Sequence, residues 1–145
     1  MTRLQKQGRA WILSRIRLRI SRYPRICEPF RILTYPMGFD RLFARREFRF
    51  YDQHDQLFAA ATSGWLLLQL DNLKILNAPR ELGAIMPDNS DREIAFPTLD
   101  KIHPPQTMDS CTRYRIQESM LDINQHLNNA EYAAVVQNAL GAGKY

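Results

Sequence analysis

The alternation of apolar and basic residues over 12–20 limits the possible folds of this chain more than any other feature. Successive side chains of a strand point to opposite faces. One face would carry Ile12, Ile16, Leu18 and Ile20, and the other would carry Arg15, Arg17 and Arg19. A helix would also align the isoleucines, but it would place Leu18 among the arginines. Alternation and β-branched side chains therefore predict a strand.

Three more strands are predicted at about 30–35, 42–51 and 57–70, with turns at 36–38 and 52–55. The second of them alternates again, because Phe48 and Phe50 fall on one side and Arg45, Glu47 and Arg49 on the other. Alanines 59–61 would suit a helix, but the Thr-Ser-Gly that follows favours a strand that packs closely against another element. We predict a curved antiparallel meander from Trp11 to Gln69, with one apolar face.

The charge of the chain is strongly skewed toward arginine. The net charge is +5, and twelve of the sixteen arginines lie between Arg3 and Arg49. Such a surface could attract nucleic acid, a membrane or an acidic protein. Arginines on the solvent side of a sheet are the simpler interpretation. The stretch lacks the interleaved lysines and aromatic residues of a nucleic-acid platform, so no nucleic-acid partner is expected.

Several classes of protein are disfavoured by the sequence. Apolar runs such as Trp65–Leu68 are too short to span a membrane, since none is longer than five residues. Arginines interrupt residues 11–20, which argues against a secretory signal, although an acid-free N-terminus leaves a mitochondrial-type presequence as an alternative. Cys27 and Cys111 form no disulfide framework and are expected to be buried thiols in a reducing cytoplasm. The absence of a phosphate loop, a serine elbow or metal-spaced ligands predicts no cofactor and no metal.

Composition divides the chain into three parts. Residues 1–76 hold the predicted strands, and 77–107 form a linker rich in proline and acids. Residues 108–145 are expected to contain a short strand at 112–117 and a helix from about 128 to 140. One face of that helix would carry Tyr132, Val135, Val136, Ala139 and Leu140. Asn128 and Glu131 have the spacing of a capping box.

The segment just before this helix carries the residues best suited to chemistry. Asp122, Asn124 and His126 alternate, so in an extended segment an acid, an amide and an imidazole would point the same way. Histidine transfers protons near neutral pH, and the helix start offers free N–H groups for a developing oxyanion. Asn128 and Asn129 are more typical of caps and turns. Trp65 and Tyr132 are expected in the core, while His54 and His103 are expected at the surface.

The pattern Asp122-x-Asn124-x-His126-x-Asn128-Asn129-x-x-Tyr132 resembles the second hot dog repeat of acyl-acyl carrier protein thioesterases. The first half agrees as well. Its matching motifs are Arg22-Tyr23-Pro24 with Glu28, Thr34-Tyr35-Pro36 with Gly38, Ala44 to Phe48, and Ala61 to Trp65. The resemblance is collinear from about Leu4 to Leu140. It implies an α+β hot dog fold, in which a curved antiparallel sheet surrounds a helix. The chain would hold a partial first repeat, within 1–76, and the opening strand and helix of a second, within 108–145.

The resemblance also implies a function, namely hydrolysis of fatty acyl-carrier thioesters in fatty acid biosynthesis. Asn124 and His126 would position and activate the attacking water, with Asp122 in support. Asn128, Asn129, Tyr132 and Trp65 would contact the substrate. The partner would be an acyl carrier protein bearing its fatty acyl chain, which the face of Arg15, Arg17 and Arg19 would attract only at long range. The sequence is compatible with a homodimer but does not fix the oligomeric state.

The family places a general-base acid on strands after the second helix, and residues 141–145 hold none. We therefore expect the chain as given, a fragment truncated at both ends, to have little activity. A non-catalytic module that binds an acyl group or a carrier, or an inactive remnant, is the alternative.

Overall fold

A computed structural model describes residues 3–87, 89, 91–107, 111, 113–122 and 125–140. The chain divides into two compact units, Met1–Ile102 and His103–Tyr145. The boundary falls inside the segment that the sequence predicts to be a linker.

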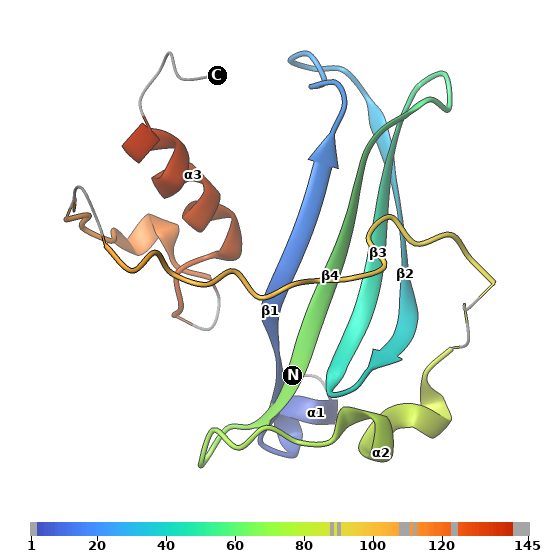
Figure 1. Ribbon diagram of the computed structural model, residues 1–145, viewed down its shortest axis with the longest axis vertical. Helices are drawn as coiled ribbons and strands as arrows, with labels where there is room; N and C mark the ends of the chain where they lie inside the picture. The colour runs from blue at the N-terminus through green and yellow to red at the C-terminus, as the bar shows by residue number, and fades with distance from the viewer. Residues whose placement is uncertain are drawn as a thin grey trace. The chain divides into compact units, whose positions relative to one another are not determined.

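The first unit is built on a four-stranded antiparallel sheet (Figure 1). Its strands are β1 (Arg9–Ile20), β2 (Phe30–Asp40), β3 (Phe43–Asp52) and β4 (Leu57–Gln69). The short helices α1 (Arg3–Lys6) and α2 (Ala78–Leu82) lie at the end of the sheet where β1 begins, and a 3₁₀ turn at Gly83–Ile85 follows α2. The four predicted strands are confirmed, but β2 continues through 36–38 to Asp40, so the turn predicted at 36–38 is wrong.

The strand order β1-β4-β3-β2 corrects the predicted meander. Only β2, β3 and β4 follow one another as hairpins, whereas β1 pairs with β4. Residues 21–29 connect β1 to β2 across the end of the sheet. With two prolines and Cys27 at a φ of 63°, this connection is too long and irregular to be a tight hairpin turn.

The strand registers confirm the predicted faces from Arg15 to Ile20, but a bulge between Leu13 and Arg15 places Ile12 on the arginine face and not with Ile16 as predicted. Leu18 pairs with Ala61, which pairs with Phe48, so the apolar positions of three strands lie together. Arg17 pairs with Thr62, which pairs with Glu47, so the polar positions line the opposite face. The two faces of the sheet therefore differ in polarity as predicted.

The packing of these faces differs from the prediction. The arginine face, expected to be the solvent side, is crossed by residues 93–99, which we call the strap. On the apolar face Ile16 remains 57% exposed and Leu18 50% exposed. Alternation identifies a strand and its two faces, but it does not show which face another segment covers.

The strap is held by a buried acid and a buried hydroxyl at the centre of the sheet. Glu47 and Thr62 are both fully buried. The Thr62 hydroxyl donates to Glu47 Oε1, and the second carboxylate oxygen accepts from the N–H of Ala95 at 3.0 Å. Thr62 Oγ1 in turn accepts from the N–H of Phe96 at 3.1 Å. Strap backbone groups that would otherwise lack partners are thereby satisfied.

Further side chains of the sheet bind the strap carbonyls. Arg45 donates to the carbonyl oxygens of Phe96 and Pro97, and Arg15 donates to that of Leu99 at 2.6 Å. The Tyr35 hydroxyl donates to the carbonyl of Glu93 at 2.9 Å. Leu99 also lies over Gly64, where an added Cβ would be only 3.3 Å from Leu99 Cδ1. Side chains of the sheet therefore hold the strap mainly by hydrogen bonds to the strap backbone.

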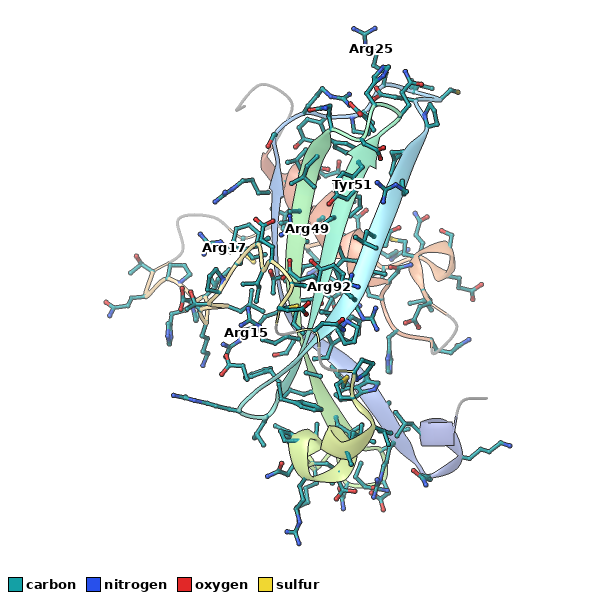
Figure 2. The ribbon with its side chains drawn as sticks, turned by 90° about the vertical axis from the view of Figure 1, so that its right-hand side faces the viewer. Arg15, Arg17, Arg25, Arg49, Tyr51 and Arg92 are labelled. Carbon is teal, nitrogen blue, oxygen red and sulfur yellow. The ribbon has the colours of Figure 1, made fainter. Side chains whose placement is uncertain are left out.

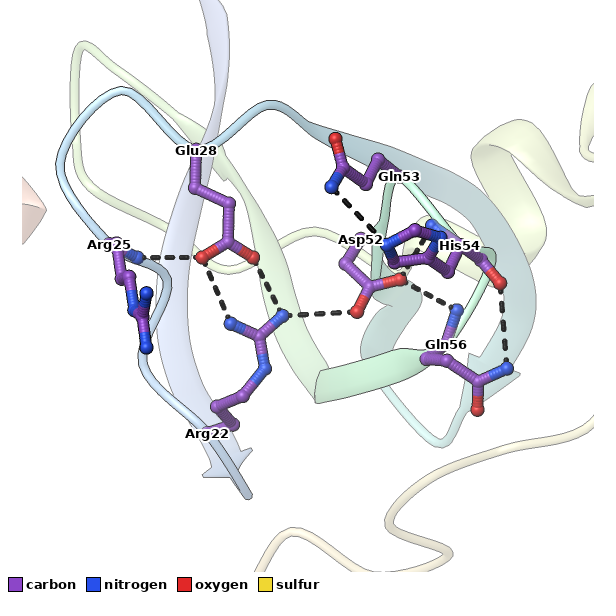
Figure 3. A network of polar contacts seen from close by, with 7 residues as sticks. All are labelled: Arg22, Arg25, Glu28, Asp52, Gln53, His54 and Gln56. Carbon is purple, nitrogen blue, oxygen red and sulfur yellow. Dashed lines mark hydrogen bonds and ion pairs between the residues drawn. The ribbon is translucent and has the colours of Figure 1, made fainter.

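A second polar network ties two loops together at the far end of the sheet (Figure 3). Arg22, in the β1–β2 connection, forms ion pairs with Glu28 at 2.8 Å and with Asp52 at 3.1 Å. Hydrogen bonding from Arg22 is the main cause of the lowered pKa of Glu28. The pKa of Asp52 is lowered chiefly by the N–H of Gln56, which donates to its carboxylate at 3.0 Å. The network holds the long connection against the β3–β4 turn.

The second unit contains a 3₁₀ turn at Glu118–Met120 and the helix α3 (Asn129–Leu140). The helix is confirmed. The short strand predicted at 112–117 is absent over 113–117, because the described residues of this unit include no other strand with which it could pair. No helix in the described part of the chain is long and apolar enough to cross a membrane.

Both cysteines are exposed and free, which corrects the expectation of buried thiols. Cys27 lies in the irregular 21–29 connection, and Cys111 lies in a stretch without helix or strand. Neither position has an element packed over it that would exclude water.

Thr62→Val should destabilise the first unit. The substitution keeps the shape of the side chain but removes a donor to Glu47 and the acceptor for the Phe96 N–H. Loss of these two buried bonds should lower the free energy of unfolding by about 2–4 kcal/mol. Thr98→Val is the matched control, because Thr98 is exposed, and it should change stability by less than about 0.5 kcal/mol. Equal urea midpoints for the two variants would contradict this role for Thr62.

Stability should also fall in acid. The pKa values of Glu28 and Asp52 are lower in the folded protein than in the unfolded chain. Their contribution is therefore complete above the ordinary carboxyl pKa of about 4 and is lost as the pH falls through the lowered values. Arg22→Gln should weaken this dependence in urea unfolding measured across the acid range. Arg25→Gln is the control, since the Arg25 contact with Glu28 is made by its backbone N–H at 2.9 Å. An identical acid dependence in both variants would exclude the ion pairs as its cause.

Candidate functional site

The segment before α3 is a closed loop and not the extended segment that the sequence suggested. The N–H of Asp122 donates to the carbonyl of His126 at 2.7 Å, and the N–H of His126 donates to Asp122 Oδ1 at 3.1 Å. Leu121 and Leu127 form an antiparallel bridge below them. Asp122 and His126 are thus brought together, but by loop closure and not by alternation.

Local hydrogen bonding explains why the segment closes. Gln125 has a φ of 63°, a left-handed conformation that reverses the chain, and its N–H donates to the carbonyl of Asp122 at 3.0 Å. Aspartate side chains commonly bond to backbone N–H groups a few residues ahead, and such bonds compete with extended structure. Asn124, the third predicted catalytic residue, lies outside the described residues.

Asn128 caps α3, as its residue type suggested. Its Oδ1 accepts from the N–H of Ala130 at 3.1 Å, and its carbonyl accepts from the N–H of Glu131 at 2.9 Å. A full capping box would also require the Glu131 side chain to bond the Asn128 N–H. That N–H instead donates to the carbonyl of Met120 at 2.9 Å, so only the first half of the predicted box forms.

The first turn of α3 keeps one donor available. The N–H of Asn129 has no hydrogen-bond partner within the described ranges. It lies at the positive end of the helix, where a developing negative charge is stabilised. His126 lies three residues before the helix and is exposed, and Asp122 is half-buried. The arrangement places a carboxylate, an imidazole and a free N–H within one short stretch.

Tyr132 is 59% exposed on α3 and Val136 is 57% exposed, which corrects the expectation that this helix face is in a core. The second unit offers no sheet among its described residues against which the face could pack. Asn128 and Asn129 are exposed as well. Of the predicted substrate-contacting residues in this unit, all are therefore accessible to solvent.

Trp65 belongs to the first unit, where it lies half-buried on β4 and lines an apolar cavity of about 470 Å³. Its Nε1 donates to Ser63 Oγ at 2.8 Å, which fixes the orientation of the indole. The cavity lining comprises Trp11, Pro36, Ala44, Arg45, Arg46, Trp65, Met86 and Pro87. A cavity walled by two indoles is suited to an apolar ligand.

Trp11 and Met86 were not identified as candidate site residues from the sequence. Trp11 precedes the alternating stretch, and pairing of β1 with β4 places it opposite Leu67, two residues beyond Trp65 on the same face. Met86 follows the 3₁₀ turn in the segment interpreted as a linker. Trp11 could be identified only from the strand order, and Met86 could be identified only from the path of residues 77–87.

The cap at Asn128 gives a direct prediction about α3. Asn128→Ala removes the only side-chain acceptor for the Ala130 N–H and should lower the local stability of the helix by about 1 kcal/mol. Amide hydrogen exchange over 129–140 would measure this as faster exchange in the first turns. Asn138→Ala is the matched control, because Asn138 is exposed and within the helix, where alanine is favourable. Unchanged protection in Asn128→Ala would show that the cap does not support the helix.

Solved structures with the same fold include acyl carrier protein (ACP) thioesterases. An acyl-ACP thioesterase from Bacteroides thetaiotaomicron is 22% identical, with a TM-score of 0.71, and the match covers 94% of this chain and 54% of that one. A 12:0-ACP thioesterase from Umbellularia californica is 21% identical, with a TM-score of 0.70, and the match covers 94% and 56%. These likenesses confirm the predicted α+β hot dog fold.

The chain thus spans about half the length of these solved structures. No curated protein matches its sequence. The sequence profile of the acyl-ACP thioesterase N-terminal domain, however, matches residues 1–86, which is more than half of the chain. The chain therefore belongs to the acyl-ACP thioesterase family.

Proposed function

We propose that this protein hydrolyses fatty acyl-ACP thioesters to free fatty acid and carrier, as a cytoplasmic step of fatty acid biosynthesis. The observation that carries the proposal is the stretch where Asp122 and His126 close a loop immediately before the N-terminus of α3. Membership of the thioesterase family supports the reaction class.

The proposed roles follow from the chemistry of each side chain. His126 accepts a proton from the attacking water, and Asn124 holds that water by hydrogen bonds. Asp122, whose carboxylate accepts from the backbone N–H of His126, keeps the loop closed and so supports the position of His126. The water adds to the thioester carbonyl, and the carbon–sulfur bond then breaks to release the fatty acid and the carrier thiol.

The start of α3 would stabilise the charge that develops on the carbonyl oxygen. The N–H of Asn129, which has no partner among the described residues, is a preorganised donor. Removing one such donor costs about 3 kcal/mol in other enzymes. Asn128 keeps the helix start in place through its cap. Tyr132, one turn further along, presents an exposed ring to an arriving substrate.

The acyl chain requires a separate apolar site, which we assign to the cavity beside Trp65. Burial of each methylene contributes about 0.8 kcal/mol, so a fatty chain gains most of its affinity from such a surface. Trp11 and Met86 extend the apolar wall formed by Trp65. This assignment supports Trp65 as a substrate-contacting residue.

His126→Ala and Asn124→Ala should each lower kcat far more than they raise KM, because both residues act on the water in the transition state. Asp122→Asn should have an equal or milder effect, since it keeps the shape and removes only the charge. Release of free fatty acid from acyl-ACP substrates of several chain lengths is the measurement. His103→Ala is the control, because His103 is exposed in a segment without helix or strand. Robust hydrolysis that survives His126→Ala would place the active site elsewhere.

The second candidate function is a non-catalytic module that binds an acyl group or a carrier. The exposure of the His126 imidazole to solvent favours it. The two candidates differ in one measurement, because a binding module would retain acyl-ACP without releasing fatty acid. In that outcome the Trp65 cavity would still bind the acyl chain, and Trp65→Ala would weaken retention.

A further inference from the structure

Two arginines of β1 share one aromatic ring of the strap. The guanidinium carbon of Arg17 lies 4.8 Å from the centroid of the Phe96 ring, and that of Arg19 lies 5.2 Å from it. Both arginines are exposed. Cation–π contact restricts a long side chain that would otherwise sample many rotamers. The two cations are therefore held close together before any partner arrives.

Phe96 is itself firmly held. Its ring is only 5% exposed, its N–H donates to Thr62 Oγ1 at 3.1 Å, and its carbonyl accepts from Arg45. The platform under the two guanidinium groups is therefore part of the buried strap network and not a loose surface side chain. A site supported in this way is preorganised.

Three of the other ring-stacking arginines, Arg22, Arg31 and Arg15, are already occupied, whereas Arg92 lies over Tyr35 without an ion pair among the described residues. Arg22 lies over Phe58 and Arg31 over Tyr51, but Arg22 pairs with Glu28 and Asp52, and Arg31 with Asp55. Arg15 lies over Phe43 and donates to the Leu99 carbonyl.

Arg17 and Arg19, in contrast, form no ion pair with any carboxylate in the described part of the chain. Two like charges held on one ring repel each other, and an oxyanion between them would relieve that repulsion.

Space for such a group lies beside Arg19. A cavity of about 230 Å³ is lined by Arg19, Ser21 and Arg49 together with backbone of the strap and of β4. Figure 2 labels Arg17 and Arg49 on this face of the sheet. Arg49 is 6% exposed, and its charge is already paired at 3.2 Å with Glu93, which also lines the recess. The positive charge available to a partner therefore comes from the two exposed arginines. The surface thus combines two presented guanidinium groups with a recess.

We propose that Arg17 and Arg19 form a paired-guanidinium site that binds carboxylates of an acidic partner protein by direct, bidentate hydrogen bonds. The proposal rests on the proposed function in taking the carrier protein as that partner. It goes beyond the long-range attraction expected from the sequence, because a guanidinium group fits a carboxylate in a way that an ammonium does not. It also separates Arg15, which binds the strap, from the two arginines that face a partner.

The test changes the hydrogen-bonding geometry of the two side chains while keeping their positive charge. Arg17→Lys/Arg19→Lys retains both positive charges, so diffusional attraction and salt dependence should be nearly unchanged. The dissociation rate of the carrier should rise about tenfold, because short-range charge pairs act mainly on dissociation. Arg41→Lys/Arg80→Lys is the matched control, since both residues are exposed and lie away from Phe96. Stopped-flow or surface binding with a carrier that lacks its prosthetic group isolates the contribution of its carboxylates.

An unchanged dissociation rate in Arg17→Lys/Arg19→Lys would overturn the proposal and leave attraction by charge alone. Phe96→Leu should also speed dissociation, compared at a temperature where thermal unfolding shows the variant to be folded. Inorganic phosphate at matched ionic strength is a further arm. If phosphate binds the pair while carrier dissociation is the same in wild type and the lysine variant, the site is a small-anion site and the proposal fails.

Failure of the proposed function would be separately visible. Hydrolysis of a small acyl thioester without a carrier does not need the paired site, so the lysine variant should match wild type in that assay. Carrier binding that depends on Arg17 and Arg19 in a chain without hydrolysis would support the site while rejecting the enzyme. Hydrolysis of the small thioester without any carrier binding would support the enzyme and reject the paired-guanidinium site.

Discussion

The hydrogen bonds among Glu47, Thr62 and the strap backbone are the interaction on which the rest of the first unit depends. A buried carboxylate is unfavourable unless its oxygens are satisfied, and both oxygens of Glu47 have donors. Those donors come from β4 and from the strap, so neighbouring strands and the strap must be in place together. The position of Phe96, and hence of the arginines above it, is set by the same bonds.

The strands could be predicted from the sequence because alternation is a local signal. The place of β1 beside β4 could not, since strand pairing depends on contacts between residues about 50 positions apart in the register. The covered face was also not predictable from polarity. Arg15 and Arg45 are basic residues typical of surfaces, yet they lie against the strap because its carbonyl groups need donors.

The candidate site was also predictable only where its structure follows from local sequence. Asn128 was recognisable as a cap from residue type and spacing alone. The closed loop was missed because it depends on Gln125 adopting a left-handed conformation, which glutamine rarely does. Trp11 was missed because its place beside the Trp65 cavity requires the β1–β4 register.

The recognition of the strap through its backbone has an evolutionary consequence. Glu47, Thr62, Arg45 and Arg15 bond to N–H and carbonyl groups that every residue other than proline possesses in full. Substitutions at exposed strap positions can therefore accumulate while its path across the sheet is preserved. The strongest selection should fall on the sheet side chains that hold the strap. Within the strap itself it should fall on Phe96, whose side chain is buried.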